Sequence, residues 1–278
     1  MKKILVLALA AILTFAAVSA LAITVAVPND TTNEARALLL LQSNGYITLD
    51  ESKGILATVA DIVDNPLGLD FYEVEAAFVP SAKVDADYAI INNNYALDAG
   101  LNPATDSLLI ESADSPYVNV ISVKEGNEEL PATKALIAAA TSQKVVDYIN
   151  EKYADGSVVA VVENPTDGFD PDVDYAALAG TTIKIAATPV PHAEVLEVAK
   201  AILAEKDITL DIQIFTDYVT PNTALESGDI DANYFAHIPY QDNFNEENGT
   251  HIVNVAGIHV EPMALYGGKQ ADLSALSK

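Results

Sequence analysis

The sequence contains no cysteine. An exported chain without cysteine forms no disulfide bonds, builds no thiolate metal site and offers no cysteine for a lipid anchor. Its stability must therefore come from ordinary hydrophobic cores. A chain of 278 residues, 50% of them hydrophobic, is long enough to form one large domain or two of ordinary size.

Positive charge is also scarce. The chain holds 14 lysine and arginine residues against 40 aspartate and glutamate residues, so its formal net charge is −26. Such an acidic surface repels nucleic acid and anionic lipid, which excludes a polyanion as partner. Among the basic residues Arg36 is the only arginine.

The motifs of common catalytic sites are absent as well. None of the four histidines lies in an H-E-x-x-H pattern, and the chain has no G-x-S-x-G motif and no glycine-rich phosphate loop. We therefore predict that the protein is not an enzyme and has no cofactor. One alternative stays open, because histidine and carboxylate ligands suffice for zinc or manganese. It is a metal-binding protein that uses His192, His237, His259 and Glu261.

The N-terminus is typical of a secretory signal. Lys2 and Lys3 precede an apolar run, and Ala20-Leu21-Ala22 offers a small-residue cleavage pattern. Residues 1–22 are predicted to be a signal peptide, with a retained anchor as the alternative. We expect a protein secreted across the cytoplasmic membrane, periplasmic or on the cell surface, without a lipid-anchor cysteine. It would associate with the membrane only through a partner or through a retained N-terminal segment.

A strand–loop–helix pattern occurs twice. Residues 23–27 form a β-rich run, followed by a polar loop and a leucine-rich helix, and the same order returns from residue 183. Residues 84–88 and 230–234 resemble each other and follow the two starts. This pattern predicts an α/β protein of two similar lobes, each with a mostly parallel sheet flanked by helices.

Three further segments complete the secondary structure. Residues 117–123 are predicted to be a strand, and residues 131–153 an alanine-rich helix. Residues 163–180 contain an acidic, turn-rich stretch that is typical of a linker.

Arg36 is the sharpest functional candidate. A guanidinium grips a carboxylate through two parallel hydrogen bonds, which an ammonium cannot do. Arg36 lies near the start of a helix that follows a strand, where an α/β lobe is expected to bind an anion. The alternative is a structural salt bridge with one of the many acidic residues.

Two other groups of residues could form a binding site. Tyr218 and residues 234–240 concentrate aromatic side chains, whose rings make favourable contacts with a thioether sulfur. Asn119 and the run Asn92-Asn93-Asn94 offer amide donors and acceptors for a polar head group. Core packing and turn formation are the alternative explanations for these two groups.

Several of these segments resemble the methionine-binding proteins of ABC uptake systems, the NlpA/MetQ lipoproteins. The resemblance covers nearly the whole chain after the signal, and the motifs that carry it are residues 28–40, 91–96, 114–119, 188–194, 215–222 and 231–240. The resemblance implies a two-lobe fold of the periplasmic-binding-protein kind (type II), with the ligand in the cleft between the lobes. It also implies a substrate-binding protein that hands L-methionine, D-methionine or a related small amino acid to an ABC transporter permease.

The resemblance assigns roles to eight residues of this sequence. Arg36 would hold the α-carboxylate with Asn33 beside it, and Asn94 and Asn119 would bind the polar head group. The wall of the side-chain pocket would be formed by Tyr218, Phe235, His237 and Tyr240. We expect Arg36 to face an open, wet cleft in the unliganded protein.

The order of the segments departs from the family's. The family begins with the segment found here at Ile183 and ends with the one found near Tyr153, which indicates a circular permutation. Residues 163–180 would join the former termini and carry little packing. One lobe would comprise residues 23–113 plus 263–278, and the other residues 114–262. The family is normally anchored through a lipid-modified cysteine, which this sequence lacks.

Overall fold

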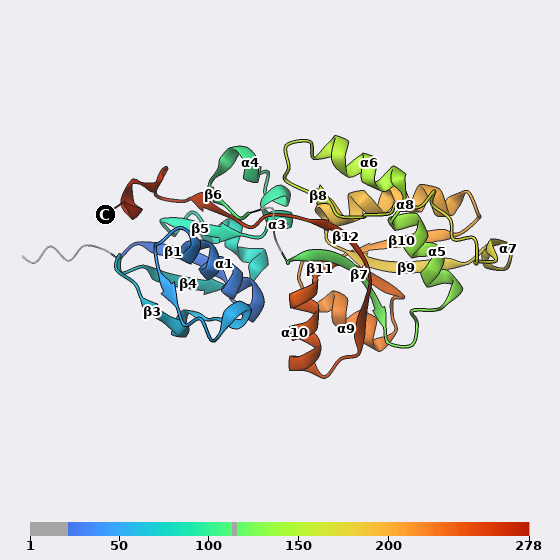
Figure 1. Cartoon of the computed structure of the whole chain (residues 1–278), viewed down its shortest axis with the longest axis horizontal. Helices are drawn as coiled ribbons and strands as arrows, with labels where there is room; N and C mark the ends of the chain where they lie inside the picture. The colour runs from blue at the N-terminus through green and yellow to red at the C-terminus, as the bar shows by residue number, and fades with distance from the viewer. Residues whose placement is uncertain (1–21, 113–115, 278) are drawn as a thin grey trace, which may run out of the picture.

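The computed structural model describes residues 22–112 and 116–277. It shows two α/β halves, each built on one sheet that helices flank (Figure 1). The predicted α/β two-lobe fold is thereby confirmed. The predicted signal segment, residues 1–22, lies outside the described residues except for Ala22. Within the described part of the chain, no helix is long and apolar enough to cross a membrane.

The first half contains a five-stranded sheet with the strand order β4-β1-β5-β13-β6. Its strands are β1 (Thr24–Pro28), β4 (Asp70–Val74), β5 (Tyr88–Ile91), β6 (Ser107–Ile110) and β13 (Ala264–Gly267). β1 pairs in parallel with β4 and β5, whereas β13 runs antiparallel to both β5 and β6. β13 is therefore the one strand that points the other way in a sheet otherwise parallel in direction.

Helices cover both faces of this sheet, which explains why β1 and β5 are apolar along nearly their whole length. They are α1 (Thr31–Ser43), α2 (Val79–Ala82), α3 (Asn93–Asp98) and α4 (Pro103–Asp106). The leucine-rich face of α1 buries Leu38 and Leu41 against the sheet. A small hairpin of β2 (Thr48–Leu49) and β3 (Ile62–Asp64) lies beside it.

The second half contains a six-stranded sheet with the strand order β10-β9-β11-β7-β12-β8. Its strands are β7 (Val118–Lys124), β8 (Val159–Ala160), β9 (Thr182–Ala187), β10 (Thr209–Ile214), β11 (Ala232–His237) and β12 (Ile252–Val260). β9 pairs in parallel with β10 and β11, and the remaining neighbours are antiparallel. The parallel core of this sheet thus has the same order as β4-β1-β5.

The two segments of the predicted internal repeat lead into corresponding strands, β5 and β11, but the aspartates in equivalent positions, Asp87 and Asp231, are two residues out of register in that alignment. Asp87 precedes β5, and its carboxylate accepts a hydrogen bond of 2.9 Å from the backbone N–H of Thr24 in β1. Asp231 precedes β11, and its carboxylate accepts one of 2.8 Å from the backbone N–H of Lys184 in β9. Asp87 therefore links the start of β5 to β1, and Asp231 links the start of β11 to β9.

The helices of the second half cover both faces of the six-stranded sheet. They are α5 (Pro131–Ala140), α6 (Gln143–Lys152), α7 (Tyr175–Leu178), α8 (Glu194–Ala204), α9 (Thr220–Ser227) and α10 (Ile238–Asn248). The single helix expected over residues 131–153 is two helices. Ser142 breaks it, because its side chain caps α6 by accepting a hydrogen bond from the backbone N–H of Val145.

The segment over residues 163–180 is packed, contrary to our expectation. Thr166 exchanges backbone hydrogen bonds of 3.0 and 2.9 Å with Thr141 and Gln143. Val173 belongs to the core of the second half, and Phe169 packs against that core. Acidic composition predicted the exposed turns correctly, but it could not reveal that apolar residues spaced between them reach the core.

The chain crosses between the halves twice, after β6 and after β12 (Figure 1). The two crossings touch: the backbone N–H of Glu111 donates to the carbonyl of Met263 at 2.9 Å. The backbone N–H of Met263 in turn donates to the Glu111 carboxylate at 3.1 Å. The hinge predicted from the sequence would lie at these two crossings. The lobe boundaries proposed from the sequence stay a prediction, and residues 113–115 lie outside the described part.

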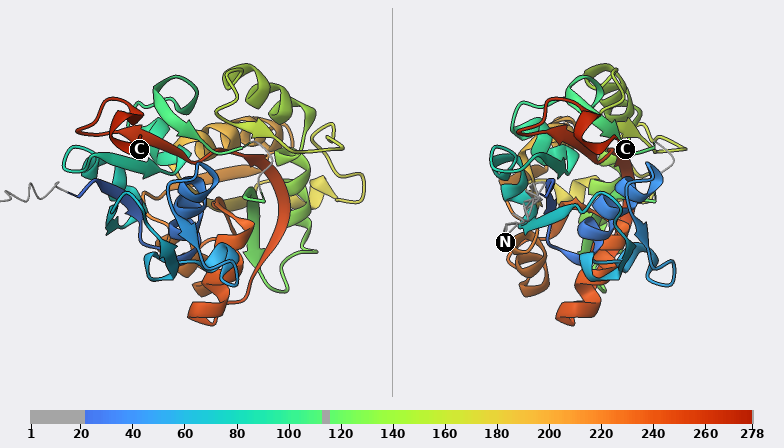
Figure 2. Two further views of the ribbon diagram at one scale, coloured as in Figure 1. Left: turned by 60° about the vertical axis from the view of Figure 1, so that its left-hand side comes forward. Right: turned by 90° about the vertical axis from the view of Figure 1, so that its left-hand side faces the viewer.

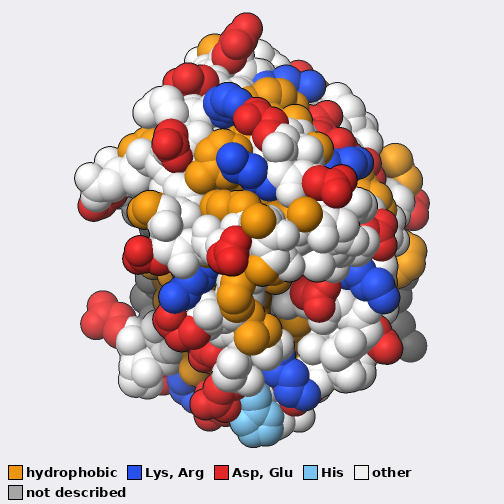
Figure 3. All heavy atoms as spheres, turned by 90° about the vertical axis from the view of Figure 1, so that its right-hand side faces the viewer, with side chains coloured by type: hydrophobic (Ala, Val, Ile, Leu, Met, Phe, Trp, Pro, Cys, Tyr) orange, Lys and Arg blue, Asp and Glu red, His pale blue; other side chains and the backbone are white. Residues whose placement is uncertain are grey.

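Both ends of the described chain pack on the first half (Figure 2). Ile23 lies at the start of β1, while Leu273 and Leu276 belong to the C-terminal turn, and all three contact the same core cluster. On the exposed face of the second half, acidic side chains and lysines are interspersed, without a continuous basic patch in that view (Figure 3). This distribution offers no surface for a polyanion on that face.

Candidate functional site

A buried pocket lies where the two halves meet. The halves close over it so tightly that the cavity measures only about 10 Å³, room for about one water molecule. It is lined by Asn33, Arg36, Asn92, Asn93, Asn94, Asn119, Tyr218, Phe235, Ala236, His237, Tyr240 and Glu261. All eight residues predicted for the binding site are among them. Their individual roles stay predictions.

The start of α1 forms one side of the pocket. Asp30 caps the helix and accepts a hydrogen bond of 2.8 Å from the side-chain amide of Asn33. Asn33 Oδ1 then accepts from Asn92 Nδ2 at 2.7 Å and pairs with His237 Nε2 at 3.0 Å. This chain of contacts joins α1 and α3 of the first half to β11 of the second.

His237 is neutral in this environment. Burial lowers its pKa well below the ordinary value, and nearby Arg36 lowers it further. Its Nδ1 accepts a hydrogen bond of 3.1 Å from the backbone N–H of Tyr240, so Nε2 carries the proton and donates to Asn33. His237 therefore holds the two halves together and presents an uncharged ring to the pocket.

Arg36 is buried, with only 3% of its surface exposed, rather than facing an open, wet cleft as we expected. Its Nε and Nη2 atoms grip the Glu111 carboxylate, with Nε at 3.0 and 3.1 Å from the two oxygens. Nη2 also donates to the carbonyl of Glu261 at 2.7 Å, and the guanidinium lies 4.2 Å from the ring centre of Tyr117. Burial favours a lower pKa for Arg36, but the Glu111 carboxylate outweighs it and the pKa is raised.

Arg36 thus forms the structural salt bridge that the sequence left open. This salt bridge does not occupy all of the hydrogen-bond donors of the guanidinium. Among the described residues, Nη1 of Arg36 has no hydrogen-bond partner, although the side chain lines the pocket. Nη1 carries two N–H donors. Arg36 can therefore remain paired with Glu111 and still donate to an anion in the pocket.

Aromatic rings form the opposite, apolar wall. The ring of Tyr218 lies 5.8 Å from that of Phe235 and 5.6 Å from that of Tyr240. The hydroxyl groups are directed to protein partners: Tyr218 donates to Asn94 Oδ1 at 2.6 Å, and Tyr240 donates to the carbonyl of Tyr218 at 2.7 Å. With the hydroxyls satisfied, the ring faces are available for an apolar or thioether side chain.

Four residues of the lining, Asn92, Asn93, Ala236 and Glu261, had no assigned ligand role in the sequence. Asn92 and Asn93 were left between ligand contact and turn formation, and Glu261 was considered only as a metal ligand. Asn93 Nδ2 donates to the carbonyl of Ser157 and to Glu261 Oε2, both at 2.9 Å. A usable signal was the abrupt change from an apolar strand to His259-Val260-Glu261, because a carboxylate directly after a buried strand needs a partner.

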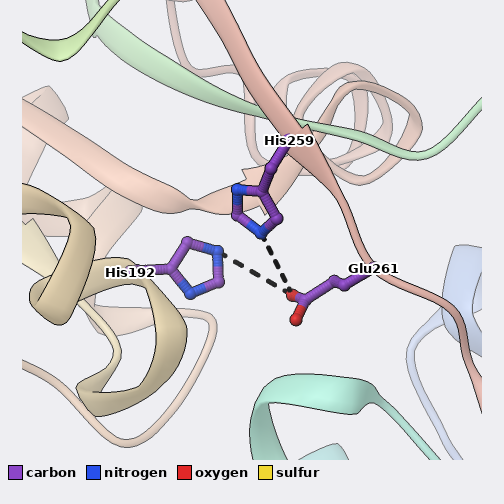
Figure 4. Close-up of side chains that lie close together, drawn as sticks. All are labelled: His192, His259 and Glu261. Carbon is purple, nitrogen blue, oxygen red and sulfur yellow. Dashed lines mark ion pairs between the residues drawn. The ribbon is translucent and has the colours of Figure 1, made fainter. Parts of the chain in front are cut away.

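His192, His259 and Glu261 converge beside the pocket (Figure 4). The Nε2 atom of each histidine lies 3.9 Å from Glu261 Oε1. Behind each ring a hydroxyl group contacts Nδ1: that of Thr188 at 2.7 Å from His192, and that of Tyr234 on His259. His237, the fourth residue of the metal alternative, is bound to Asn33 instead.

The cluster is wider than a zinc site. Bonds of about 2.0–2.2 Å in a tetrahedron place ligand atoms roughly 3.3 Å apart, whereas the separations here reach 3.9 Å and the three ligand atoms spread over up to 4.8 Å. His192 Nε2 is also engaged by Asn119 Oδ1 at 3.0 Å. The arrangement therefore favours a polar network around Glu261 over a preformed metal centre.

The charges in this network follow from burial. Burial lowers the pKa of His192 to about 3, so this ring is neutral. Burial alone would raise the pKa of Glu261, but contacts with the two histidines and Asn93 outweigh it and lower that pKa. Glu261 is therefore an ionised carboxylate, only 6% exposed.

Comparison with known proteins gives partial matches of high identity. The D-methionine-binding lipoprotein MetQ of Escherichia coli (strain K12) is 43% identical over 136 residues, which are 48% of this chain and 50% of that protein. Membrane lipoprotein TpN32 of Treponema pallidum is 41% identical over 134 residues, with coverages of 48% and 50%. The chain thus spans about half the length of the curated relatives it matches.

Solved structures match in the same partial way. A nutrient-binding protein from Burkholderia cenocepacia bound to methionine is 43% identical, with a TM-score of 0.45, over 48% of this chain and 56% of that chain. The methionine-binding protein MetQ is 42% identical, with a TM-score of 0.46, over 49% and 56%. Since these scores lie below 0.5, the superpositions carry no structural argument.

The relatives correct one expectation. We expected a secreted protein without a lipid-anchor cysteine, but the matching proteins are lipoproteins, which carry such a cysteine. The expectation of an unanchored protein is therefore wrong. A position outside the cytoplasmic membrane agrees with the relatives.

The match to a protein family is more extensive than any match to a single relative. The family described as NlpA lipoprotein matches residues 19–162 and 183–278, well over half of the chain. The resemblance noted from individual motifs is thereby confirmed. The chain belongs to the NlpA lipoprotein family.

Proposed function

We propose that the protein binds methionine in the pocket between its halves and delivers it to the permease of an ABC importer. The observation that carries this proposal is the pocket itself, in which a guanidinium and several amides face an aromatic wall. The chemistry of this lining suits a free amino acid with an apolar side chain, which enters when the halves move apart. Relatives named as D-methionine-binding lipoproteins, each matched over about half its length, support methionine as that amino acid.

The polar end of the pocket would hold the methionine head group. Nη1 of Arg36 donates to the α-carboxylate while Nε and Nη2 stay on Glu111. Asn33, Asn94 and Asn119 complete the polar contacts. The thioether lies against Tyr218, Phe235, His237 and Tyr240. Nothing in this arrangement requires a reaction, so the protein acts as a binding protein and not as an enzyme.

Binding and release require the halves to open. In this structure contacts across the pocket close it, among them Asn33 with His237, Asn93 with Glu261 and Tyr218 with Asn94. A ligand can enter only when these hydrogen bonds break and the two crossings bend. The closed form, with the ligand buried, is the one that the permease recognises.

We also infer that the chain is a circular permutant. The family matches two blocks that flank residues 163–182, the segment proposed to join the former termini. A collinear comparison can follow only one block of a permuted chain, which accounts for relatives that match about half of this chain and half of themselves. In this proposal the lobes comprise residues 23–113 plus 263–278, and residues 114–262.

Isothermal titration calorimetry with L-methionine, D-methionine and zinc tests the function. We expect one methionine per chain and a raised melting temperature, because a ligand that binds only the folded state stabilises it. Native mass spectrometry of freshly purified protein would show a retained ligand by its mass. Stoichiometric zinc binding without any response to either methionine enantiomer would contradict the proposal and favour the metal alternative.

A further inference from the structure

One turn of the second half contacts the first half at two places. Residues 153–158 form this turn and join α6 to β8 (Figure 1). The carbonyl of Ser157 accepts a hydrogen bond of 2.9 Å from Nδ2 of Asn93, a residue of the pocket lining on α3. Oδ2 of Asp155 accepts one of 2.7 Å from Nδ2 of Asn102, which caps α4. The turn therefore bridges the two halves at the pocket and also at the surface.

Asp155 connects these two contacts. Its Oδ1 atom accepts hydrogen bonds from the backbone N–H of Ser157 at 2.9 Å and from the Ser157 hydroxyl at 2.7 Å. Gly156, between the two residues, has φ +82°, a conformation that glycine adopts without strain. Because one oxygen of Asp155 holds Ser157 while the other accepts from Asn102, the position of the Ser157 carbonyl beside Asn93 depends on the contact at the surface.

The donor and the acceptor at the surface are both fixed. Oδ1 of Asn102 accepts from the backbone N–H of Ala104 at 2.8 Å as the cap of α4, so Nδ2 is the atom that faces Asp155. Burial alone would raise the pKa of Asp155, but hydrogen bonds from Asn102 and Ser157 outweigh it and lower that pKa. Asp155 is therefore an ionised acceptor, and a hydrogen bond to an ionised group is stronger than one between neutral groups.

This surface contact lies outside the ligand pocket. Neither Asn102 nor Asp155 belongs to the pocket lining, and Asp155 is exposed while Asn102 is half-buried. When the halves move apart, the bond between these two residues must break, because one belongs to each half. A contact made only in the closed form stabilises that form, and it raises the apparent affinity of any ligand that needs closure.

We propose that Asn102 and Asp155 form a latch that holds the two halves closed, and that this latch sets the affinity and the residence time of the ligand without touching it. The inference rests on the proposed function for the identity of the ligand, but closure itself is measurable without ligand. Asp155 acts as a positioning residue, through Ser157 on Asn93. Because the latch does not contact the ligand, it changes the affinity for every ligand of the pocket by the same factor.

A pair of substitutions tests the latch by breaking and restoring it. Asn102→Asp keeps the oxygen that caps α4 but places a carboxylate oxygen opposite Asp155, so attraction becomes repulsion. Asp155→Asn alone places an amide N–H opposite that of Asn102 and should also weaken the latch. The two substitutions together exchange donor and acceptor, because the new amide still accepts from Ser157 through its oxygen while it donates across the interface. Each single variant should therefore be defective, and the double variant should be restored.

Calorimetry and stopped-flow tyrosine fluorescence measure the effect on methionine binding. We expect each single variant to bind L-methionine about 3- to 10-fold more weakly than the wild type, the range for one hydrogen bond, mainly through faster dissociation. The loss is partial because other contacts outside the pocket still join the halves, such as that of Thr31 with Glu247 at 3.1 Å. Asn127→Asp is the charge control, because Asn127 lies in the turn after β7, among residues of the second half.

Single-molecule fluorescence energy transfer measures closure without ligand. The chain has no cysteine, so Ser52→Cys and Glu246→Cys, one exposed position in each half, give two unique labelling sites. The closed fraction should fall in each single variant and return in the double variant. The melting temperatures of the unliganded variants should stay close to that of Asn127→Asp, because the latch joins the halves and does not hold either one folded.

The outcomes separate the latch from the proposed function. If the wild type binds no methionine, the proposed function fails, and the closed fraction still decides on the latch. If methionine binds but the single variants match Asn127→Asp in affinity and closed fraction, or the double variant is no better than either single variant, only the latch is overturned. Single variants that melt well below the control would assign Asn102 and Asp155 to the stability of their own halves, which overturns the latch as well.

Discussion

At the scale of single residues, Arg36 forms the salt bridge that the sequence left open as an alternative, and it also lines the pocket. Its Nε and Nη2 atoms pair with Glu111 next to the crossings between the halves, and Nη1 has no hydrogen-bond partner among the described residues. A lysine in its place could supply the charge but not the fork that engages Glu111, the Glu261 carbonyl and a ligand at once. In the proposed complex with methionine, this one side chain links the closed arrangement of the halves to the ligand.

Replacing Arg36 should therefore reduce both stability and affinity. We expect Arg36→Ala to lower the free energy of unfolding by about 3 kcal/mol, the cost of leaving one member of a buried ion pair alone. It should weaken methionine binding by about thirty-fold or more. Urea denaturation and calorimetry measure the two effects, and Arg36→Lys should weaken binding as well.

A surface ion pair provides the control for Arg36. Lys144 and Glu205 lie 3.1 Å apart, but their side chains are 59% and 53% exposed. Lys144→Ala should change stability by less than about 1 kcal/mol and leave binding unchanged. If Arg36→Ala costs no more stability than Lys144→Ala, the pair with Glu111 is not a structural element.

The buried histidines predict how stability depends on pH. Burial lowers the pKa of His192 from 6.5 to about 3, so the unfolded chain takes up a proton before the folded one does. Stability from this residue is complete above pH 6.5 and is lost as the pH falls toward 3; between pH 7 and pH 5 the loss is about 2 kcal/mol. Glu261, with its lowered pKa, contributes in the same direction at lower pH.

Urea denaturation at pH 7 and pH 5 checks this dependence. His192→Gln should show a fall in stability about 2 kcal/mol smaller than that of the wild type. His251→Gln is the control, because the His251 side chain is 63% exposed and lies away from the pocket. Identical pH dependence in all three proteins would show that His192 is already protonated or accessible in the folded state.

At the scale of elements, the segment over residues 163–180 packs against the second half and does not form a free loop. Gly168 has φ +104°, and a Cβ atom there would lie 2.8 Å from Ile202 in α8. Gly180 has a similar positive φ of +79°, but a Cβ atom there would meet nothing within 4 Å. The two glycines separate the cost of backbone strain from the cost of a clash.

Alanine substitutions at these two positions should differ in their effect. Both lose stability because alanine disfavours positive φ, but Gly168→Ala should cost about 1–3 kcal/mol more, as overpacking does. Thermal denaturation of both variants measures the difference. Equal losses would mean that the segment does not rest on α8 in solution.

The packing of residues 163–180 also bears on the expected result of proteolysis within this segment. Pro171 and Asp172 are exposed, whereas Val173 and Thr166 anchor the chain on either side. Proteolysis at this point should leave both fragments associated with methionine binding intact. Separation of the fragments under native conditions would show that the connection itself holds the second half together.

At the scale of the whole molecule, both ends of the described chain pack on one core. Ile23 and Leu276 contact the same cluster in the first half. A circular permutation requires chain ends that lie near each other, because the termini in one order of segments are joined by a peptide connection in the other order.

Restoring the family's order tests the permutation. A chain that starts at residue 183, joins residue 277 to residue 22 through a short glycine–serine linker and ends at residue 162 should fold. We expect an unchanged circular-dichroism spectrum and unchanged methionine affinity, with some loss of stability from the missing packing of residues 163–182. A chain that fails to fold, or folds without binding, would contradict the proposed permutation.

The sequence by itself determined the local pattern. The order of strand, loop and helix in both halves followed from apolar periodicity, because strands and helices bury their side chains with periods of 2 and 3.6. The lone arginine, the dense aromatics and the amide run, together with the family resemblance, indicated all eight predicted pocket residues. Composition contributed to this because a residue type that is rare in the chain, such as the single arginine, indicates a position with a specific chemical role.

Only the tertiary structure decided which of those residues contact one another and which hydrogen bonds they form. Arg36 and Glu111 are 75 positions apart, and Asn93 and Glu261 are 168 apart. No local pattern could therefore reveal that the first pair occupies most of the guanidinium or that the second pair joins the two sides of the pocket. The break at Ser142 and the packing of Phe169 and Val173 were hidden for the same reason. Hydrogen-bond partners and burial depend on how distant segments meet, and that is a property of the folded chain.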